Sequence, residues 1–423
     1  MRNAELKNIL AKEQYGSRKQ MSAIDQCLNK RLTFDLLRQL KRTAAVCSND
    51  AKTCYDRIVH SIASICMQRN GVHEAPIVCM FTTIQKLEHV IRTIYGDSTL
   101  SFGGESLWTV PVQGVGQGNG AGPQIWAVVS TPVLNMLREE GFGAYFRASI
   151  SGEKMGFVGY AFVDDTDLCE TSGFQFANAS TVAIQMQRSL DHCEGGIRAF
   201  GGAIVPEKSH WYLIDFKLDQ GNWHYATKED APATLTVQDS TGQRCTLDQL
   251  STHEARRTLG VRLAPDGNDQ EEVTYLRQCG EAWKERIRTG HLPRHLAWQA
   301  LTTTILPKIH YPLAATTLTL DQCKYILAPI LQGGLPTSGI VRTLPHTLVY
   351  GTTRYQGLGL PSLYTEQGIS HITKLLQHGA KDNITGQLLR SSLEALQLEL
   401  GTSAFPLDLQ HSSMASSLLR VGL

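Results

Sequence analysis

The chain has 423 residues, of which 42% are hydrophobic and 19% are charged, and its formal net charge is +1. This composition is typical of a globular protein, and the length favours about two or three domains. No stretch approaches the roughly 18 apolar residues of a membrane span, and the charged start lacks a secretory signal. We therefore expect a nuclear or cytoplasmic protein without a membrane segment. Ten cysteines without CxxC spacing indicate neither a zinc knuckle nor a disulfide framework.

Apolar spacing predicts the elements of the first third of the chain. Leucines and isoleucines three and four residues apart predict a helix over 22–41, and a short buried strand over 43–47 follows. Asp50 lies just past the end of this strand. Further along we expect helices over 55–68 and 76–94, and then a hairpin over 98–112 that turns at Gly103-Gly104.

A glycine-rich loop over 113–122 leads into a helix that opens at Pro123. The elements expected after that helix are strands at 143–149 and 157–163, a returning strand at 166–170, a helix at 176–199, strands at 209–216 and 258–263 with a polar strand-like stretch between them, and helices at 269–289, 294–306, 320–332 and 366–378. This order predicts an α+β domain followed by a helical one.

A basic stripe on a predicted helix pair could supply local positive charge for phosphate binding. It comprises Lys284, Arg286, Arg288, His291, Arg294 and His295. A nucleic-acid enzyme usually has a basic footprint, which a net charge of +1 does not provide. The stripe is either that footprint or an ordinary solvated helix face.

Two adjacent acids, Asp164 and Asp165, follow an apolar strand in the segment YAFVDDTDL. Adjacent carboxylates after a buried strand are unfavourable unless something neutralises them, and a divalent metal ion would do so. Asp50, which ends a different strand, supplies a third carboxylate. Three such oxygen ligands suit a pair of hard cations that catalyse an in-line displacement. The alternatives are a polar hairpin tip for the pair and a helix N-cap for Asp50.

The loop QGNGAGP, residues 117–123, runs into a helix N-terminus. Its glycines allow close approach of a substrate, and a helix N-terminus favours anionic ligands. It lacks the Lys-Ser/Thr of a P-loop, so an ordinary flexible loop is the alternative.

Taken together, these segments resemble the reverse transcriptase family, and most closely its non-LTR retrotransposon members. EQYGSRKQMSAID resembles the Q-x-G-F-R segment, SNDAKTCYDRI resembles D-x-x-x-A-F-D, and QGNGAGP resembles Q-G-x-x-x-S-P. AFVDD matches F/Y-x-D-D, PEKSHW contains the lysine of the next motif, and RTLGVRLAPDG resembles the L-G grip. The six motifs occur in the family's order over residues 13–267.

The resemblance implies an α+β polymerase fold, in which a palm of antiparallel sheet backed by helices carries partial fingers and a mainly helical thumb. It assigns 1–45 to partial fingers, 46–267 to the palm with inserted fingers elements, and 268–423 to the thumb and a C-terminal extension. The implied activity is RNA-directed DNA polymerisation, which adds dNTPs to a primer 3′-hydroxyl. The implied partners are an RNA template, a DNA primer and dNTPs.

The resemblance also assigns roles to residues. Asp50, Asp164 and Asp165 would bind two Mg²⁺ ions, or Mn²⁺ in their place. Tyr55 would be a steric gate against the ribose 2′-hydroxyl, although a core aromatic is the alternative. The remaining assignments are Arg18 at the incoming triphosphate, Gln117 and Gly118 at template or nucleotide, and Lys208 as a proton donor to pyrophosphate, for which a solvated lysine is the alternative.

Three residues depart from the family pattern: Ser17 replaces Phe, Cys54 replaces Ala, and Gly122 replaces Ser. The family's first fingers segments would precede Glu13, so we expect an N-terminally truncated chain that lacks a fingers or endonuclease portion of a polyprotein. One alternative is an inactive retroelement remnant that keeps the palm and binds RNA. Another is a different palm enzyme, either an RNA-copying RNA polymerase, against which the bulky Tyr55 argues, or a nucleotide cyclase.

Overall fold

The structure is a computed structural model that describes residues 4–5, 7–103, 113–116 and 118–408. Contacts divide the chain into two compact units, each assembled from separated stretches. Unit 1 is Met1–Ala23, Lys41–Arg147 and Glu153–Ser251, and unit 2 is Ile24–Leu40, Ala148–Gly152 and Thr252–Leu423. The predicted α+β class is confirmed. The assignment of consecutive regions to fingers, palm and thumb stays a prediction.

Unit 1 is organised around a five-stranded sheet in the order β13-β8-β1-β7-β6. Neighbouring strands are antiparallel, except that β13 and β8 are parallel. The central strand β1 is buried at five of its six positions, which explains its nearly continuous run of small apolar residues. The bounds are β1 Ala44–Asn49, β6 Gly159–Phe162, β7 Asp165–Glu170, β8 His210–Ile214 and β13 Asp248–Leu250.

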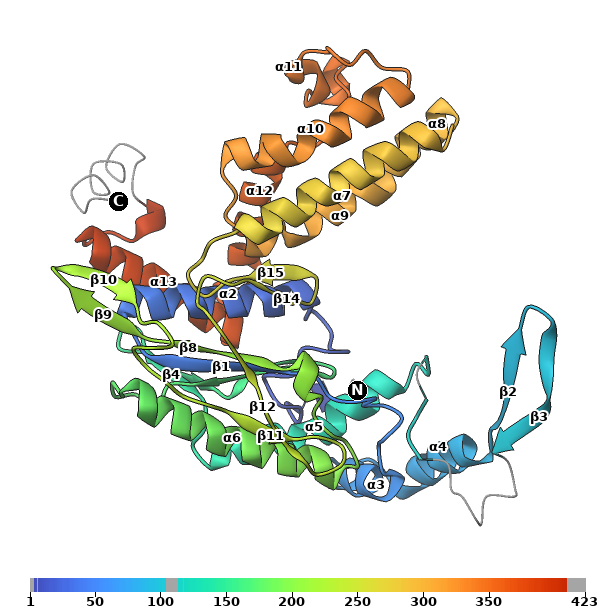
Figure 1. Cartoon of the computed structure of the whole chain (residues 1–423), viewed down its shortest axis with the longest axis vertical. Coiled ribbons are helices and arrows are strands. Elements are labelled where there is room, and N and C mark those ends of the chain that lie inside the picture. The colour runs from blue at the N-terminus through green and yellow to red at the C-terminus, as the bar shows by residue number, and fades with distance from the viewer. Residues whose placement is uncertain (1–3, 6, 104–112, 117, 409–423) are drawn as a thin grey trace. The chain divides into compact units, whose positions relative to one another are not determined.

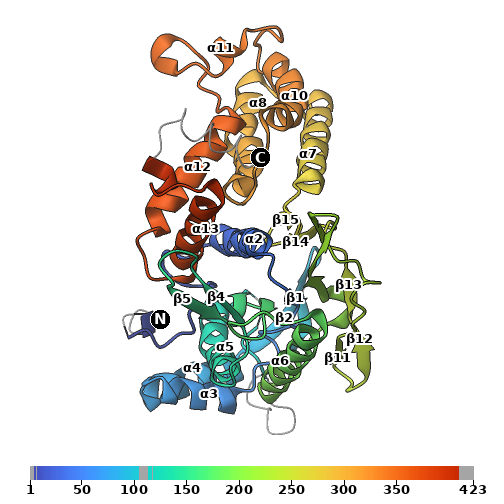
Figure 2. The same cartoon turned by 90° about the vertical axis from the view of Figure 1, so that its left-hand side faces the viewer.

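Two helices, α5 (Gly122–Glu139) and α6 (Ala179–Ala199), cover one side of this sheet (Figures 1 and 2). Each buries an apolar face in the core of unit 1, and α6 begins where the Asn178 side chain accepts a hydrogen bond from Thr181 N. Helix α3 (His60–Arg69) packs against α5, and α4 (Glu74–Lys86) packs against α3. The helix expected from Tyr55 therefore begins five residues later.

The segment after α4 corrects the prediction of a helix over 76–94. The helix expected to continue to Ile94 ends at Lys86, and the chain forms a hairpin of β2 (Glu88–Thr93) and β3 (Gly96–Gly103). Its turn is at Ile94 and Tyr95, which are 92% and 94% exposed. Gly103, the first residue of the turn predicted at Gly103-Gly104, is the last residue of β3 and is paired with Glu88. The rest of the predicted hairpin, 104–112, lies outside the described residues. Figure 1 shows this hairpin standing away from the sheet of unit 1.

Three smaller two-stranded sheets complete unit 1. The turns predicted at Gln220-Gly221 and Thr241-Gly242 are confirmed, since each joins a pair of antiparallel strands. The pairs are β4 (Ala144–Arg147) with β5 (Lys154–Phe157), β9 (Phe216–Asp219) with β10 (Asn222–Tyr225), and β11 (Thr236–Gln238) with β12 (Arg244–Thr246).

Unit 2 is mainly helical, as predicted. A hairpin of β14 (Arg256–Thr258) and β15 (Val261–Leu263) occupies the region expected as a single strand. Its helices are α2 (Ala23–Leu40, within the unit from Ile24), α7 (Gln270–Thr289), α8 (Arg294–Ala300), a π-helical turn at Leu301–Ile305, α9 (Leu306–His310), α10 (Leu320–Thr337), α11 (His346–Val349), α12 (Leu363–His378) and α13 (Ile384–Leu400). The helix α13 was not predicted. None of the described helices is long and apolar enough to cross a membrane.

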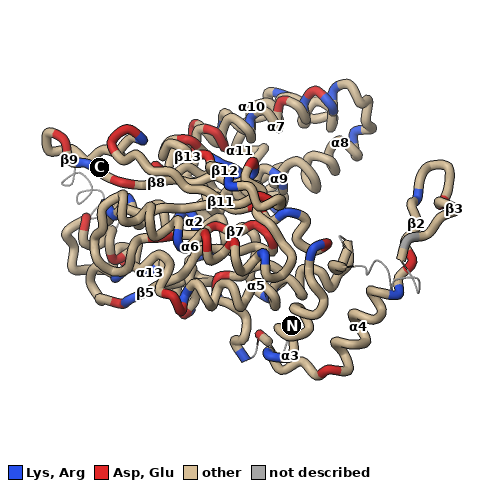
Figure 3. The backbone as a smooth tube through the Cα atoms, turned by 60° about the horizontal axis from the view of Figure 1, so that its bottom comes forward, with Lys and Arg blue, Asp and Glu red and all other residues tan. Residues whose placement is uncertain are grey.

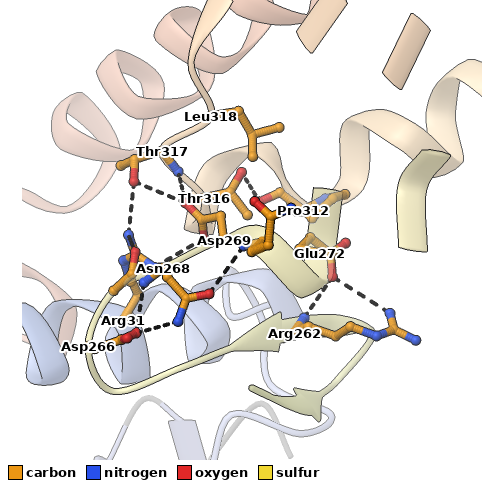
Figure 4. A network of polar contacts seen from close by, with 12 residues as sticks. Arg31, Arg262, Asp266, Asn268, Asp269, Glu272, Pro312, Thr316, Thr317 and Leu318 are labelled. Carbon is orange, nitrogen blue, oxygen red and sulfur yellow. Dashed lines mark hydrogen bonds and ion pairs between the residues drawn. The ribbon is translucent and has the colours of Figure 1, made fainter. Parts of the chain in front are cut away.

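Helix α2 carries buried charged residues, and each has a partner within unit 2. The Arg31 guanidinium donates to Asp269 Oδ1 at 3.1 Å, to Gly267 O at 2.8 Å and to Thr317 Oγ1 at 2.9 Å. Figure 4 shows this network, in which Asp269 also accepts from the backbone and hydroxyl of Thr317. Asp25 pairs with Lys374 at 2.6 Å. These ionic contacts join helix α2 to segments more than 200 residues further along the chain.

The basic stripe lies on α7 and α8, and part of its charge is matched by acids on the same helix. Lys284 Nζ is 3.7 Å from Glu281 and Arg288 is 2.7 Å from Glu285. Figure 3 shows acidic and basic positions mixed along α7. Ion pairs between neighbouring side chains of one helix are typical of a solvated helix face, which is the second of the two interpretations of the stripe.

Glu170, at the end of β7, is a buried carboxyl group. It is 2% exposed and accepts hydrogen bonds from Gly143 N at 3.0 Å and Ser172 N at 2.7 Å. Burial raises the pKa of Glu170 to about 7, although these N–H donors oppose the shift. A pKa raised on folding means that the folded state binds the proton more tightly. This contribution to stability is therefore complete below about pH 4.5 and is lost as the pH rises to about 7.

We expect Glu170→Gln to remove this loss, which is on the order of 3 kcal/mol at most. The free energy of unfolding of the variant, measured in urea at pH 5 and pH 8, should change less between the two pH values than that of the wild type. The exposed Glu229→Gln is the control and should keep the wild-type pH dependence. An unchanged pH dependence in Glu170→Gln would show that another group is responsible.

Candidate active site

Asp50 directly follows the central strand β1, as predicted. Its backbone is held on the β8 side of the sheet, because Asp50 O accepts from Val205 N at 2.9 Å and Asp50 N donates to Ser209 Oγ at 3.4 Å. The hydroxyl of Ser209 in turn donates to Val205 O. Asp50 therefore has a fixed main chain and a partly exposed side chain, 24% accessible to solvent.

Asp164 and Asp165 lie at the tight turn between β6 and β7, at the tip of the predicted hairpin. The turn requires a left-handed conformation at Val163, whose φ is 60°. For a β-branched residue this conformation costs about 1–3 kcal/mol and persists only where the surroundings impose it. The strain therefore falls one residue before the first acid.

The segment around Gln14 imposes that conformation. Gln14 Oε1 accepts from Val163 N at 2.9 Å, and Gln14 Nε2 and the Trp126 indole N–H both donate to Val163 O. Tyr15 N donates to Ala161 O at 2.7 Å, so this segment runs alongside β6. A Cβ on Gly16 would lie 2.5 Å from Val163 N, so only glycine permits the close approach.

The structure brings Asp50, Asp164 and Lys208 into one neighbourhood. Lys208 Nζ is 3.1 Å from Asp50 Oδ2. The pKa of Lys208 is raised, first by its hydrogen bond to Asp50 and also by the charges of Asp164 and Asp165. The pKa of Asp164 is raised by burial and also by the like charge of Asp50. Among the described residues, no group of three or more His, Cys, Asp or Glu side chains is arranged to hold a metal ion.

Cys54 and Tyr55 lie next to these acids. The Cys54 side chain, 3% exposed, hydrogen-bonds to the Asp164 carboxylate. The pKa of the thiol is raised to about 12, mainly by burial and then by the Asp164 charge, so it stays protonated and donates. Burial, Cys54 and Asp164 raise the pKa of Tyr55 to about 12. Tyr55 is half-buried, in a turn before α3.

The glycine-rich loop is fastened near Tyr55 at its start. Val115 N donates to Tyr55 O at 2.9 Å, and His60 Nε2 is 2.6 Å from Gly114 O. Further along, Gly118 has a φ of +89°, and a Cβ there would meet nothing within 4 Å. Gln117, the other predicted contact to template or nucleotide, lies outside the described residues.

Arg18 is engaged within the N-terminal segment. It forms an ion pair with Glu5 at 2.9 Å and donates to Ala11 O at 2.8 Å, and its side chain is 7% exposed. Its predicted contact with the incoming triphosphate would require this ion pair to open. Ser17, which replaces Phe in the family pattern, has a left-handed φ of 59°.

Some residues that shape the candidate site were not predicted from the sequence. They are Gln14 and Trp126, which hold the turn before Asp164, Ser209, which fixes Asp50, and Cys54 in its contact with Asp164. Gln14 and Trp126 are 149 and 37 residues from Val163, so local periodicity carries no signal for these contacts. The resemblance of Gln14 to the glutamine of the Q-x-G-F-R segment was the one sequence feature that pointed to Gln14.

Comparisons with known proteins give distant likenesses. No family model matches the chain, and no curated protein does. The apo telomerase of Candida tropicalis is 12% identical, with a TM-score of 0.39 over 98% of this chain and 57% of that one. The Candida albicans telomerase in complex with a fragment of telomeric RNA is 10% identical, with a TM-score of 0.37 over 99% and 57%. A C. tropicalis telomerase truncated from its C-terminal domain is 13% identical, with a TM-score of 0.33 over 55% and 40%.

The chain thus spans between 40% and 57% of the length of these telomerase chains. Likenesses at these identities and TM-scores assign it to no family.

Proposed function

We propose that the chain is an RNA-directed DNA polymerase of the non-LTR retrotransposon kind. The observation that supports the proposal is the pairing of β1 with β7, in which Asn49 lies opposite Thr166, so that Asp50 and the turn with Asp164 and Asp165 lie at the same edge of the sheet. A basic group, Lys208, lies 3.1 Å from the first of them. A glycine-rich loop and the Tyr55 ring lie beside these acids. Carboxylates paired in this way at adjacent strand ends suit nucleotidyl transfer.

The acids are chemically suited to magnesium. Their oxygen ligands are the type that Mg²⁺ prefers. Burial and, to a lesser degree, the like charge of Asp50 raise the pKa of Asp164, and a divalent cation would offset both effects. Asp50 and Asp164 would hold the metal ions, with Asp165 as the third carboxylate. Bound magnesium would lower the pKa of a primer 3′-hydroxyl and stabilise the charge on leaving pyrophosphate.

The remaining groups would bind and position the substrates. The Lys208 ammonium, 69% exposed, has the reach and the proton to meet the leaving pyrophosphate. The Tyr55 ring would close the space beside the ribose C2′, while Gly118 and Gln117 would lie along the template or nucleotide. Arg18 would contact the triphosphate after leaving Glu5.

Primer extension on an RNA template tests the proposal. With Mg²⁺ and dNTPs, the full chain should lengthen a labelled DNA primer, and EDTA should stop the reaction. Asp50→Asn should lower the rate by about 10³-fold, which corresponds to some 4 kcal/mol of transition-state stabilisation. The control is Asp321→Asn, because that side chain is 92% exposed on α10 and is not one of the residues of the candidate site.

The proposal is wrong if the folded chain extends no primer with either Mg²⁺ or Mn²⁺. It is also wrong if Asp50→Asn extends the primer as fast as Asp321→Asn does.

A second candidate is an inactive remnant that keeps the fold and binds RNA. Two observations favour this candidate. Among the described residues, no three His, Cys, Asp or Glu side chains are arranged to hold a metal ion, and Asp50 already forms an ion pair with Lys208. Such a protein would bind RNA with an affinity that falls as salt rises, and Asp50→Asn would not weaken that binding. RNA binding without extension would support this second candidate.

A further inference from the structure

The ring of Tyr55 packs directly against the α-carbon of Gly122. A Cβ built on Gly122 would lie 3.3 Å from Cδ1 and 3.5 Å from both Cε1 and Cγ of the ring. Gly122 is buried in the first turn of α5, whereas Tyr55 is half-buried. The ring is therefore supported on one side by bare backbone and keeps an exposed portion of its surface.

The main chain of Tyr55 is fixed independently of this contact. Its carbonyl accepts from Val115 N at 2.9 Å, and the next residue, Asp56, donates to Thr53 O at 3.0 Å. The position of the ring is consequently decided by side-chain torsion and by what it packs against. Besides Gly122, its neighbours there include the apolar residues of the unit 1 core.

Backbone conformation does not demand a glycine at position 122, because its φ is not in the left-handed region. Another role for the missing Cβ is relief of crowding, since the next residue is Pro123 and a Cβ before proline disfavours helical backbone. A Cβ on Gly122 could therefore act through the Tyr55 ring or through Pro123. The Tyr55→Ala/Gly122→Ala double variant distinguishes these two explanations.

We infer that Gly122 is a specificity-determining residue, which sets the position of the Tyr55 ring and thereby the discrimination between deoxyribonucleotides and ribonucleotides. This inference rests on the proposed function. In the family that the sequence resembles, this position is usually Ser. The chain therefore departs from the family pattern at the residue against which the proposed steric gate, Tyr55, packs. The small residue lets the ring lie closer to α5 than any side chain would permit.

Adding a Cβ should displace the ring by a few tenths of an ångström, away from α5. A misplacement of about 1 Å costs on the order of 100-fold in rate, so a few tenths should change kcat/KM about threefold or more. The ring would move toward its open side, where the sugar would bind. We therefore expect Gly122→Ala to raise the KM for dNTPs more than it lowers kcat, and to change the dNTP-to-rNTP ratio of kcat/KM by about threefold or more.

Single-nucleotide insertion on a primed RNA template provides the test. The enzymes compared are the wild type, Gly122→Ala, Gly122→Ser, Tyr55→Ala and the Tyr55→Ala/Gly122→Ala double variant. If Gly122 acts through the ring, its substitution changes the ratio in the wild-type background and has no further effect once the ring is removed. The matched control is Gly195→Ala, a helical glycine of α6 whose Cβ would meet nothing within 4 Å.

Two results would overturn the inference: a ratio in Gly122→Ala within twofold of the wild type, or the same change in the Tyr55→Ala background. The second would assign the effect to Pro123 or to α5. A wild-type enzyme that inserts neither nucleotide would contradict the proposed function instead. In that case ¹⁹F NMR of 3-fluorotyrosine at position 55 still tests the contact, because its signal should shift in Gly122→Ala and not in Gly195→Ala.

Discussion

Asp164→Asn should abolish primer extension while leaving the protein as stable as before, or more so. The loss should be at least about 10³-fold, since the amide removes a charge that the proposed metal ions would require. Stability should not fall, because burial and the nearby Asp50 carboxylate both raise the pKa of Asp164 and so disfavour its charge in the folded chain. The measurements are the extension rate with Mg²⁺ and the urea midpoint without added metal.

This combination separates a catalytic carboxylate from a structural one. A residue that only held the fold would lose activity and stability together, whereas functional sites often gain stability when their strained groups are removed. Asp321→Asn, on the exposed first turn of α10, should change neither quantity. Undiminished extension by Asp164→Asn would remove Asp164 from the site, and a large fall in the urea midpoint would indicate a structural role.

Asp269→Ala should destabilise unit 2 by about 3–5 kcal/mol, because it leaves the Arg31 guanidinium buried without its carboxylate. The two side chains are only 6% and 5% exposed. Asp269 also accepts from Thr317 N and Oγ1 at 2.9 Å and 3.1 Å, so the backbone at the start of α10 loses a partner too (Figure 4). Hydrogen exchange should accelerate first in peptides from α2 and from 316–320.

Asp35→Ala is the matched control for this prediction. Asp35 contacts the same guanidinium at 3.5 Å, but its side chain is 23% exposed and also pairs with Arg38. A partly exposed pair of this type is worth about 1 kcal/mol or less. Equal losses from Asp35→Ala and Asp269→Ala would show that burial of the pair is not what makes Asp269 important.

Periodicity predicted the long helices well, because their apolar stripes repeat over several turns. The helix α2 and the helix α6 both lie within three residues of their predicted bounds. The error at β2 has a physical cause. Leu87, Val90 and Ile91 have helical spacing, yet the chain pairs locally with 96–103 through the turn at Ile94 and Tyr95. Since β2 is exposed along its whole length, no burial pattern marked it as a strand.

The candidate site was predictable in its acids and not in their surroundings. Asp50 and Asp164 were singled out because each follows a strand. The order of the motifs, which resembles that of reverse transcriptases, led us to assign both to one site. The Asp50–Lys208 ion pair joins residues that are separated in the sequence by β6, β7 and α6. Between Tyr55 and Gly122, the sequence includes residues outside the described part. Contacts between such separated segments depend on tertiary packing, for which one sequence carries no periodic signal.

The interleaved composition of the two units has a consequence for synthesis. Helix α2 is synthesised well before the partners of Asp25 and Arg31: Asp269 lies 238 residues after Arg31, and Lys374 lies 349 residues after Asp25. Until those residues are made, the charges of Asp25 and Arg31 lack the ionic partners that they have in the folded chain. Cutting the chain after Ser251 would leave α2 in the same condition permanently. Neither unit can therefore be produced as one continuous piece, and α2 acquires these ionic partners only after the residues between them have been made.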